Sequence, residues 1–190
     1  MAFKNQLALF FDHPARDLSS QLSDYACVAL ILRGDSMENL EVGFILRAAN
    51  PLDRWSGQLA FPGGRSEAFD LNDVQTALRE TKEEIGLELH PEDLLGRLDD
   101  VQARRRGETL NFFIRAFVFY LDREFTMKLD TSEVEDFFWF PVKNLLDPAR
   151  QTKVQEYPGI HLRPGPPLWG LTLLMVSNFL RLCNFTVPSP

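Results

Sequence analysis

The sequence predicts a mixed α/β sandwich, from three observations. Four β-rich apolar or aromatic segments are typical of strands, and they lie at residues 25–32, 41–48, 110–121 and 137–142. An amphipathic helix is predicted between the second and third of these, at residues 71–85, and a largely apolar helix near the end, at residues 168–182. Because strands and helices alternate without the regular spacing of a doubly wound parallel sheet, we expect a mixed sheet in a sandwich.

The connections between these elements carry their own signals. Residues 33–39 contain glycine, aspartate and asparagine, which is typical of a hairpin joining the first two strands. Gly86 stands where a helix usually ends. Residues 157–167 hold four prolines and predict an irregular connector.

A helical wheel divides residues 71–85 into two sides. The apolar side is expected to hold Leu71, Val74, Leu78, Thr81 and Ile85. The opposite side is expected to hold Glu80, Glu83, Glu84, Asp73, Thr76 and Ala77.

The length of 190 residues fits one domain over residues 1–190. Within it we expect an N-terminal extension at residues 1–24 and a C-terminal connector and helix at residues 157–190.

Composition excludes several classes of protein. Twenty basic against 27 acidic residues give a net charge of −7, which argues against a general nucleic-acid binder and fits carboxylates around a divalent metal. Cys27 and Cys183 lie in apolar stretches and are expected to be buried, reduced thiols. The first residues lack the pattern of a signal peptide, and residues 168–182 are too short to span a bilayer. We therefore expect a cytoplasmic protein without a membrane partner.

Three glutamates on the middle helix stand out. Glu80, Glu83 and Glu84 lie within about one turn, where like charges repel, so helix propensity does not explain them. A solvated acidic face, partly compensated by neighbouring basic residues, is one interpretation. The other interpretation is a metal and phosphate site. It depends on Gly63 and Gly64, which are separated from the helix by a short loop, since paired glycines let the main chain approach a ligand closely. Carboxylates beside such a turn suit Mg²⁺ and a substrate phosphate.

The segment from Gly64 to Leu87 closely resembles the signature of the Nudix hydrolases. Its second half, RETKEEIGL, matches except that Thr81 stands at an apolar position. In the first half Asp70 replaces a glutamate, and one extra residue precedes Arg79. The resemblance implies the family's α/β/α sandwich and hydrolysis of a nucleoside diphosphate linked to another moiety. It also implies Mg²⁺ or Mn²⁺ as cofactor.

The resemblance further implies roles for individual residues. Glu80 and Glu84 correspond to the principal metal ligands. Glu83 corresponds to a further ligand, directly or through water, that helps position the attacking water. The carbonyl oxygen of Gly64 would lie near the metal, Gly63 and Gly64 would line the substrate, and Arg79 would orient the glutamates.

The general base is left open between two loop residues. Some family members use a glutamate outside the signature, and Glu133, which precedes the fourth strand, is the candidate here. A solvent-facing acid is the alternative interpretation, and Glu135 is the second candidate.

Within the family, the upstream segments 45–48 and 57–64 resemble the coenzyme A diphosphatase branch. Ala48 replaces a serine of that pattern, and the region between the two segments departs from it. Arg47 and Arg54 would bind substrate phosphates, since arginine offers a bidentate fork; unliganded surface arginines are the alternative.

Two other functions stay open. The substrate could instead be ADP-ribose, a nucleotide sugar or a dinucleotide, or the chain could be a non-catalytic nucleotide-binding module. Relatives are frequently homodimers, and the aromatic strands and apolar last helix leave surface for a homodimer here.

Overall fold

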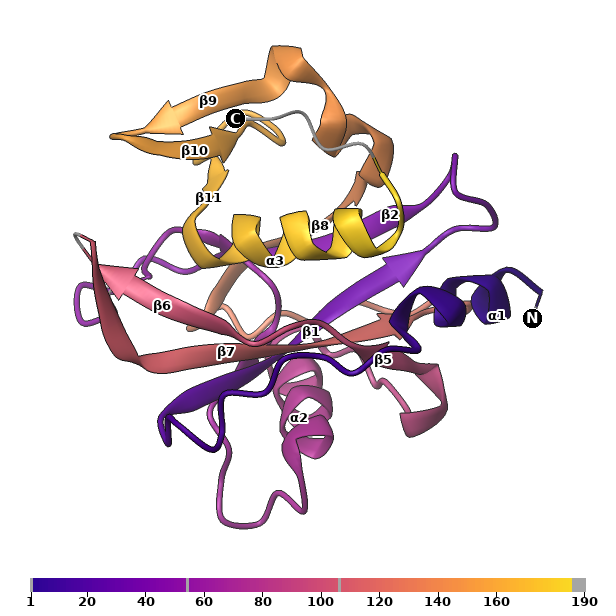
Figure 1. Ribbon diagram of the computed structural model, residues 1–190, viewed down its shortest axis with the longest axis horizontal. Helices are drawn as coiled ribbons and strands as arrows, with labels where there is room; N and C mark the ends of the chain where they lie inside the picture. The colour runs from indigo at the N-terminus through magenta and orange to yellow at the C-terminus, as the bar shows by residue number, and fades with distance from the viewer. Residues whose placement is uncertain (1, 54, 106, 186–190) are drawn as a thin grey trace.

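The centre of the fold is a mixed β-sheet with a helix on each face (Figure 1). The computed structural model describes residues 2–53, 55–105 and 107–185. Its helices are α1 (Ala2–Ala8), α2 (Asp73–Ile85) and α3 (Gly170–Leu182). The main sheet contains β1 (Tyr25–Arg33), β2 (Glu41–Arg47), β3 (Leu59–Ala60), β4 (Gly63–Gly64), β5 (Leu94–Arg97), β6 (Val101–Arg105), β7 (Glu108–Tyr120) and β8 (Val134–Pro141). A smaller sheet contains β9 (Gln151–Val154), β10 (Tyr157–Ile160) and β11 (Leu168–Trp169).

The expected mixed sheet is confirmed. β1 and β7 run parallel in register from Tyr25 opposite Phe113 to Leu32 opposite Tyr120, and the other pairs in this sheet are antiparallel. Both central strands carry continuous buried runs, because helices cover both of their faces.

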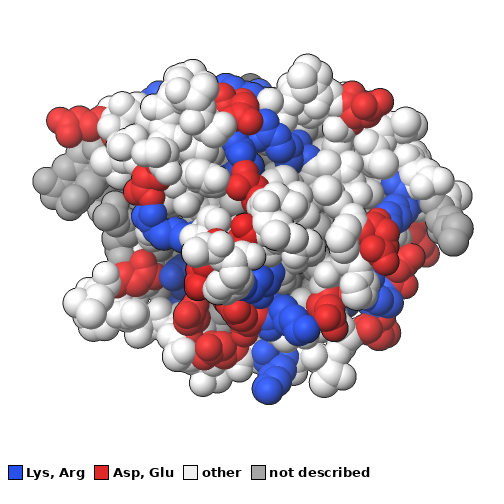
Figure 2. Space-filling view, turned by 90° about the horizontal axis from the view of Figure 1, so that it is seen from below, with Lys and Arg blue, Asp and Glu red and all other residues white. Residues whose placement is uncertain are grey.

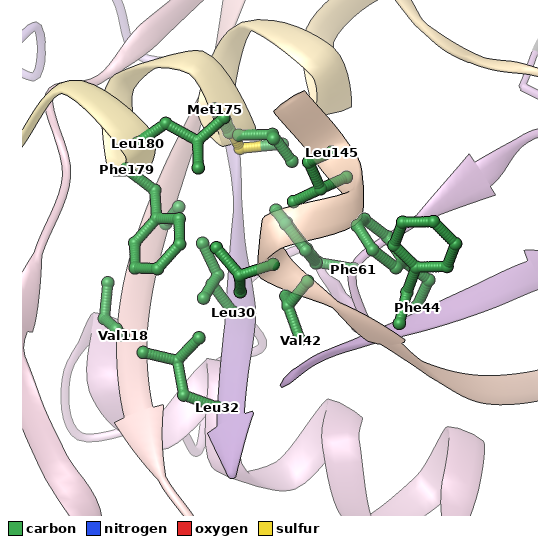
Figure 3. Close-up of a cluster of buried hydrophobic side chains, with 14 of the residues drawn as sticks. Leu30, Leu32, Val42, Phe44, Phe61, Val118, Leu145, Met175, Phe179 and Leu180 are labelled. Carbon is green, nitrogen blue, oxygen red and sulfur yellow. The ribbon is translucent and has the colours of Figure 1, made fainter. Parts of the chain in front are cut away.

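Two apolar cores lie on the two faces of the sheet. On one face, α3 packs Met175, Phe179 and Leu180 toward sheet residues (Figure 3). These sheet residues include Leu30, Leu32, Val42, Phe44 and Val118. On the other face, α2 contributes Ala77, Leu78 and Ile85 to a second buried cluster. Cys27 and Cys183 are both buried and free, as expected.

β1 and β2 separate soon after their hairpin, and the glycine turn fills the opening. The two strands pair at Leu32–Val42 and Arg33–Glu41, whereas Gly63 and Gly64 pair with Val28 and Cys27. Gly63 has φ +149°, and a Cβ there would lie 2.3 Å from the Cys27 carbonyl oxygen, so no other residue fits. The turn is therefore part of the sheet, and α2 packs against it.

The structure corrects the predicted division of α2. The helix begins at Asp73, after Asn72 whose side chain accepts from the Gln75 N–H, so Leu71 lies outside it with 89% of its surface exposed. The residues Thr76, Ala77 and Glu84, predicted on the polar side, are buried. Since the two glycines of β4 lack side chains, α2 packs closely against them and buries this side as well. The predicted end at Gly86, in left-handed conformation, is confirmed.

The proline-rich region is also more ordered than predicted. Residues 157–160 are not an irregular connector, because they form β10, which pairs with β9 and β11. β11 pairs only with Gly159 and Ile160, so Pro158 lies where no ladder hydrogen bond to β11 is required. α3 begins at Gly170, two residues later than predicted. Within the described part of the chain, no helix is long and apolar enough to cross a membrane.

Candidate active site

The three glutamates of α2 occupy different environments. Glu84 is 2% exposed and Glu80 14% exposed, and both lie on the side that faces β4. Glu83 is 58% exposed. The predicted grouping on one face therefore holds for Glu80 and Glu84, one helical turn apart, and Glu83 lies at its edge.

Glu84 is a buried carboxylate with little compensation. The Gly63 N–H donates to its Oε2 at 2.9 Å, and Nη1 of Arg47 lies 4.0 Å from its Oε1. Burial raises the pKa of Glu84 to about 8, while the Gly63 N–H and the Arg47 charge act in the opposite direction. The charges of Glu80 and Glu133 raise it further. A cation close to this carboxylate would favour its charged form.

Glu80 lies directly over the second glycine. A Cβ on Gly64 would be 2.5 Å from the Glu80 carboxylate, so the absence of a side chain makes room for that carboxylate. Burial raises the pKa of Glu80, and the ion pair with Arg79 lowers it; the charges of Glu83 and Glu133 raise it. The carboxylates of Glu80 and Glu84 thus lie against the same two-residue strand.

Arg79 is the centre of an ion-pair network beside these carboxylates. It contacts Glu80 at 2.9 Å and Glu83 at 2.8 Å through Nη1, and it donates to both oxygens of Asp70 at 3.0 Å. The hydrogen bond from Arg79 lowers the pKa of Asp70 to about 2. Acidic and basic side chains intermingle over this face of the molecule (Figure 2). Asp70, the departure from the family pattern, therefore anchors the arginine of the signature.

Glu133 approaches the site from a loop that is fastened on two sides. The Ala48 N–H donates to the Glu133 carbonyl at 2.8 Å, and the Asp130 N–H donates to the Glu84 carbonyl at 2.9 Å. The Glu133 side chain is exposed, and its charge acts on both Glu80 and Glu84. Glu135 is exposed on β8. The structure thus brings the first candidate base within electrostatic range of the buried glutamates.

A small hollow adjoins this loop, with a volume of about 210 Å³. Its lining consists of Arg47, Ala48, Asn50, Asp53, Ser132 and Glu133. Arg47 donates to Oδ2 of Asp53 through Nε at 3.0 Å and Nη2 at 2.7 Å, which directs its third nitrogen toward Glu84. The sequence analysis did not single out Asp53. The one feature of the sequence that could have indicated this ion pair is an acidic residue six positions after Arg47. Arg54 lies outside the described residues.

The oxygen atoms at this site are ligands of the kind that a hard divalent cation prefers. Glu80, Glu84 and the β4 main chain offer oxygen atoms, and the raised pKa of buried Glu84 shows that the protein alone stabilises the charged form of this carboxylate poorly. In the described ranges, no three His, Cys, Asp or Glu side chains are already arranged to hold a metal ion.

Comparison with known proteins agrees with this geometry: the chain belongs to the Nudix family, since residues 26–160 match the NUDIX domain model. It is 32% identical to the peroxisomal coenzyme A diphosphatase ndx-8 of Caenorhabditis elegans over 186 residues, 88% of this chain and 77% of that protein. It is 31% identical to the human mitochondrial coenzyme A diphosphatase NUDT8 over 147 residues, 73% of this chain and 61% of that protein.

The similarity covers only part of these relatives, and it extends to solved structures. The chain spans between 43% and 77% of the length of such curated relatives. A crystal structure of a MutT NUDIX hydrolase from Burkholderia pseudomallei has the same fold, with a TM-score of 0.53 and 18% identity over 82% of this chain and 96% of that one. Nudix enzymes act on small-molecule nucleotide substrates and generally use divalent metal ions.

Proposed function

We propose that this chain is a metal-dependent diphosphatase that hydrolyses coenzyme A or its derivatives, releasing 3′,5′-ADP and phosphopantetheine. The observation that carries the proposal is the buried Glu84 carboxylate, held by the Gly63 N–H beside Glu80, with Arg47 4.0 Å away. This arrangement places carboxylates that can bind a metal ion beside an arginine, Arg47, that can bind a phosphate. The similarity to two coenzyme A diphosphatases supports the choice of substrate.

The cation site would be formed by Glu80, Glu84 and the Gly64 carbonyl, with Glu83 contributing directly or through water. Mg²⁺ or Mn²⁺ bound there would neutralise charge on the diphosphate and lower the pKa of a bound water. Oxygen ligands suit both ions.

The remaining groups bind, orient and move protons. Glu133 would accept the proton of the attacking water, because its charge already reaches Glu80 and Glu84. Arg47 would bind a phosphate oxygen of the substrate, with Asp53 holding its guanidinium in place. Arg79, fixed by Asp70, would orient Glu80. Arg54 remains a proposed phosphate ligand on sequence grounds alone.

The test is turnover by the purified chain with Mg²⁺ or Mn²⁺ and a panel of diphosphates. The panel contains coenzyme A, acyl-coenzyme A, ADP-ribose, a nucleotide sugar, NADH and a dinucleotide. The matched control is Glu84→Gln, which keeps the size and the bond from Gly63 but removes the charge. Release of 3′,5′-ADP from coenzyme A, lost in the control, supports the proposal.

Other outcomes would contradict the proposal in distinct ways. Cleavage of ADP-ribose or another nucleotide instead of coenzyme A would retain the mechanism and replace the substrate. Nucleotide binding without any turnover would identify a binding module.

A further inference from the structure

We propose that Asp130 is a positioning residue for Glu133, coupling the turn that carries this proposed base to the helix that carries Glu84. The inference rests on the proposed function, since it concerns the same site. It is argued from the hydrogen bonds that join the loop at residues 128–134, here called the base loop, to α2.

The base loop is fastened to the carboxyl end of α2. The last carbonyls of a helix have no partner within the helix and must find one elsewhere. Here the Lys128 N–H donates to the Ile85 carbonyl at 3.0 Å, and the Asp130 N–H donates to the Glu84 carbonyl at 2.9 Å. A Cβ on Gly86 would be 2.9 Å from the Lys128 Cβ, so the loop also packs closely on the helix end.

Asp130 shapes the turn that follows. Its carbonyl accepts from the N–H groups of Glu133 at 3.0 Å and Val134 at 2.8 Å. Its side-chain Oδ1 accepts from the Ser132 N–H at 2.9 Å and the Ser132 hydroxyl at 2.6 Å. An aspartate that bonds the backbone two residues ahead closes an Asx turn, which fixes the chain direction. One residue thus connects the Glu84 main chain to the Glu133 main chain.

The Glu133 carboxylate depends on this backbone for its position. Across the described ranges, no hydrogen bond or ion pair fixes that carboxylate, which is exposed. Its main chain, in contrast, is held at both ends, by Asp130 at the N–H and by Ala48 at the carbonyl. If the Asx turn is lost, the two main-chain bonds of Glu133 remain, but the turn that sets the direction of its side chain loses the bonds that Ser132 donates to Asp130.

Asp130 itself is absent from the lining of the hollow beside Arg47, although Ser132 and Glu133 are part of it. Its removal should therefore affect the catalytic step more than substrate binding. This expectation separates a positioning role from a contribution to substrate affinity.

The experiment is a double-mutant cycle on the full chain with coenzyme A. Asp130→Ala is expected to lower kcat about tenfold with KM unchanged, because small misplacements of a catalytic group are costly in rate. Asp130→Asn, whose amide oxygen can still accept from Ser132, should restore most of the activity. In the Glu133→Gln background, Asp130→Ala should cause no further loss, because the group that it positions is already disabled.

The matched control is Asp147→Ala. Asp147 makes a similar side-chain bond to the Ala149 N–H at 2.9 Å, in the turn at Pro148–Arg150. This variant should leave kcat unchanged. A second readout needs no substrate: amide hydrogen exchange at Ser132 and Glu133 should speed up in Asp130→Ala and stay unchanged in Asp147→Ala.

Three results would overturn the proposal: wild-type kcat in Asp130→Ala, an equal loss in the Glu133→Gln background, or unchanged exchange at Ser132 and Glu133. Full activity of Glu133→Gln would also overturn it while leaving the diphosphatase function in place. If the wild-type chain hydrolyses nothing, the proposed function fails, and the exchange measurement alone decides whether Asp130 orders the base loop.

Discussion

The carboxylate of Glu80 occupies the space that a side chain on Gly64 would need. A Cβ at Gly64 would lie 2.5 Å from Cδ and Oε1 of Glu80 and 2.7 Å from its Oε2. The neighbouring Gly63 is glycine for another reason, since its φ of +149° and its contact with Cys27 exclude a side chain on backbone grounds. A side chain at Gly64 would therefore disturb the candidate site, whereas a side chain at Gly63 would disturb the backbone of the fold.

Gly64→Ala is expected to lose activity without unfolding. The methyl group displaces Glu80, and a displacement of about 1 Å at a reacting centre can cost roughly a hundredfold in rate. Turnover of coenzyme A and thermal melting would be measured together. Gly63→Ala serves as the contrast and should lower the melting temperature, because its Cβ would be 2.5 Å from the Val28 Cα. A Gly64→Ala protein with normal kcat would contradict the close packing of Glu80 on β4.

Glu84 should make the metal-free protein less stable as the pH rises. Its pKa is raised from 4.5 to about 8, so between these values the folded chain holds a proton that the unfolded chain releases. The free energy of unfolding therefore falls with rising pH across this window, by on the order of 4 kcal/mol. Urea unfolding in the presence of a chelator, at about pH 5 and about pH 9, measures the difference.

The matched pair of variants for this test is Glu84→Gln and Glu83→Gln. Glu84→Gln should abolish most of the pH dependence and stabilise the protein at high pH. Glu83→Gln, on the exposed edge of the same helix, should retain it. An equal slope in Glu84→Gln and wild type would show that burial of Glu84 does not control the stability.

Asp53→Ala is expected to weaken substrate binding. It removes the carboxylate that receives Nε and Nη2 of Arg47 at 3.0 and 2.7 Å, so the guanidinium loses its fixed direction. KM should rise roughly tenfold, the scale of one hydrogen bond to a charged group, while kcat changes less. Steady-state kinetics with coenzyme A give both values. Asp35→Ala, on the turn between β1 and β2, is the control and should leave KM unchanged.

Asp100→Ala is expected to destabilise the protein strongly. Asp100 is fully buried and accepts from Nε and Nη2 of Arg115 at 3.0 and 2.8 Å, so its removal leaves a buried guanidinium short of partners. Breaking such a pair costs about 3–5 kcal/mol. Denaturant unfolding measures this loss, with Asp99→Ala as the neighbouring control. Among the described residues, the Asp99 side chain accepts one bond, from the exposed Arg16 main-chain N–H at 2.7 Å, and about 1 kcal/mol is expected for its loss.

The main elements could be predicted from local patterns, because each carries a periodicity. The aromatic run that became β7 and the helix ending at Gly86 are examples. The buried side of α2 could not be predicted this way, since Glu84 lies against Gly63 and Glu80 against Gly64, on another element. β10 was missed because proline count is a local signal, whereas pairing with β9 and β11 is a tertiary one.

The candidate site shows the same limit. The signature located Glu80, Glu84 and Arg79, but the anchoring of Arg79 by Asp70 and of Arg47 by Asp53 depends on chain segments that meet only in the fold. The cytoplasmic location, the homodimer, the single-domain organisation and the role of Arg54 stay predictions.

The parallel pairing of β1 with β7 has a consequence for how the chain reaches its native state. Tyr25 pairs with Phe113, so the two central strands meet across a sequence separation of 88 residues. Contacts between such distant segments slow folding, since a long loop must close before they form. During synthesis, the apolar β1 cannot pair with β7 until β7 has emerged from the ribosome. A nascent chain stalled before residue 108, where β7 begins, should therefore depend on chaperones to keep β1 from aggregating.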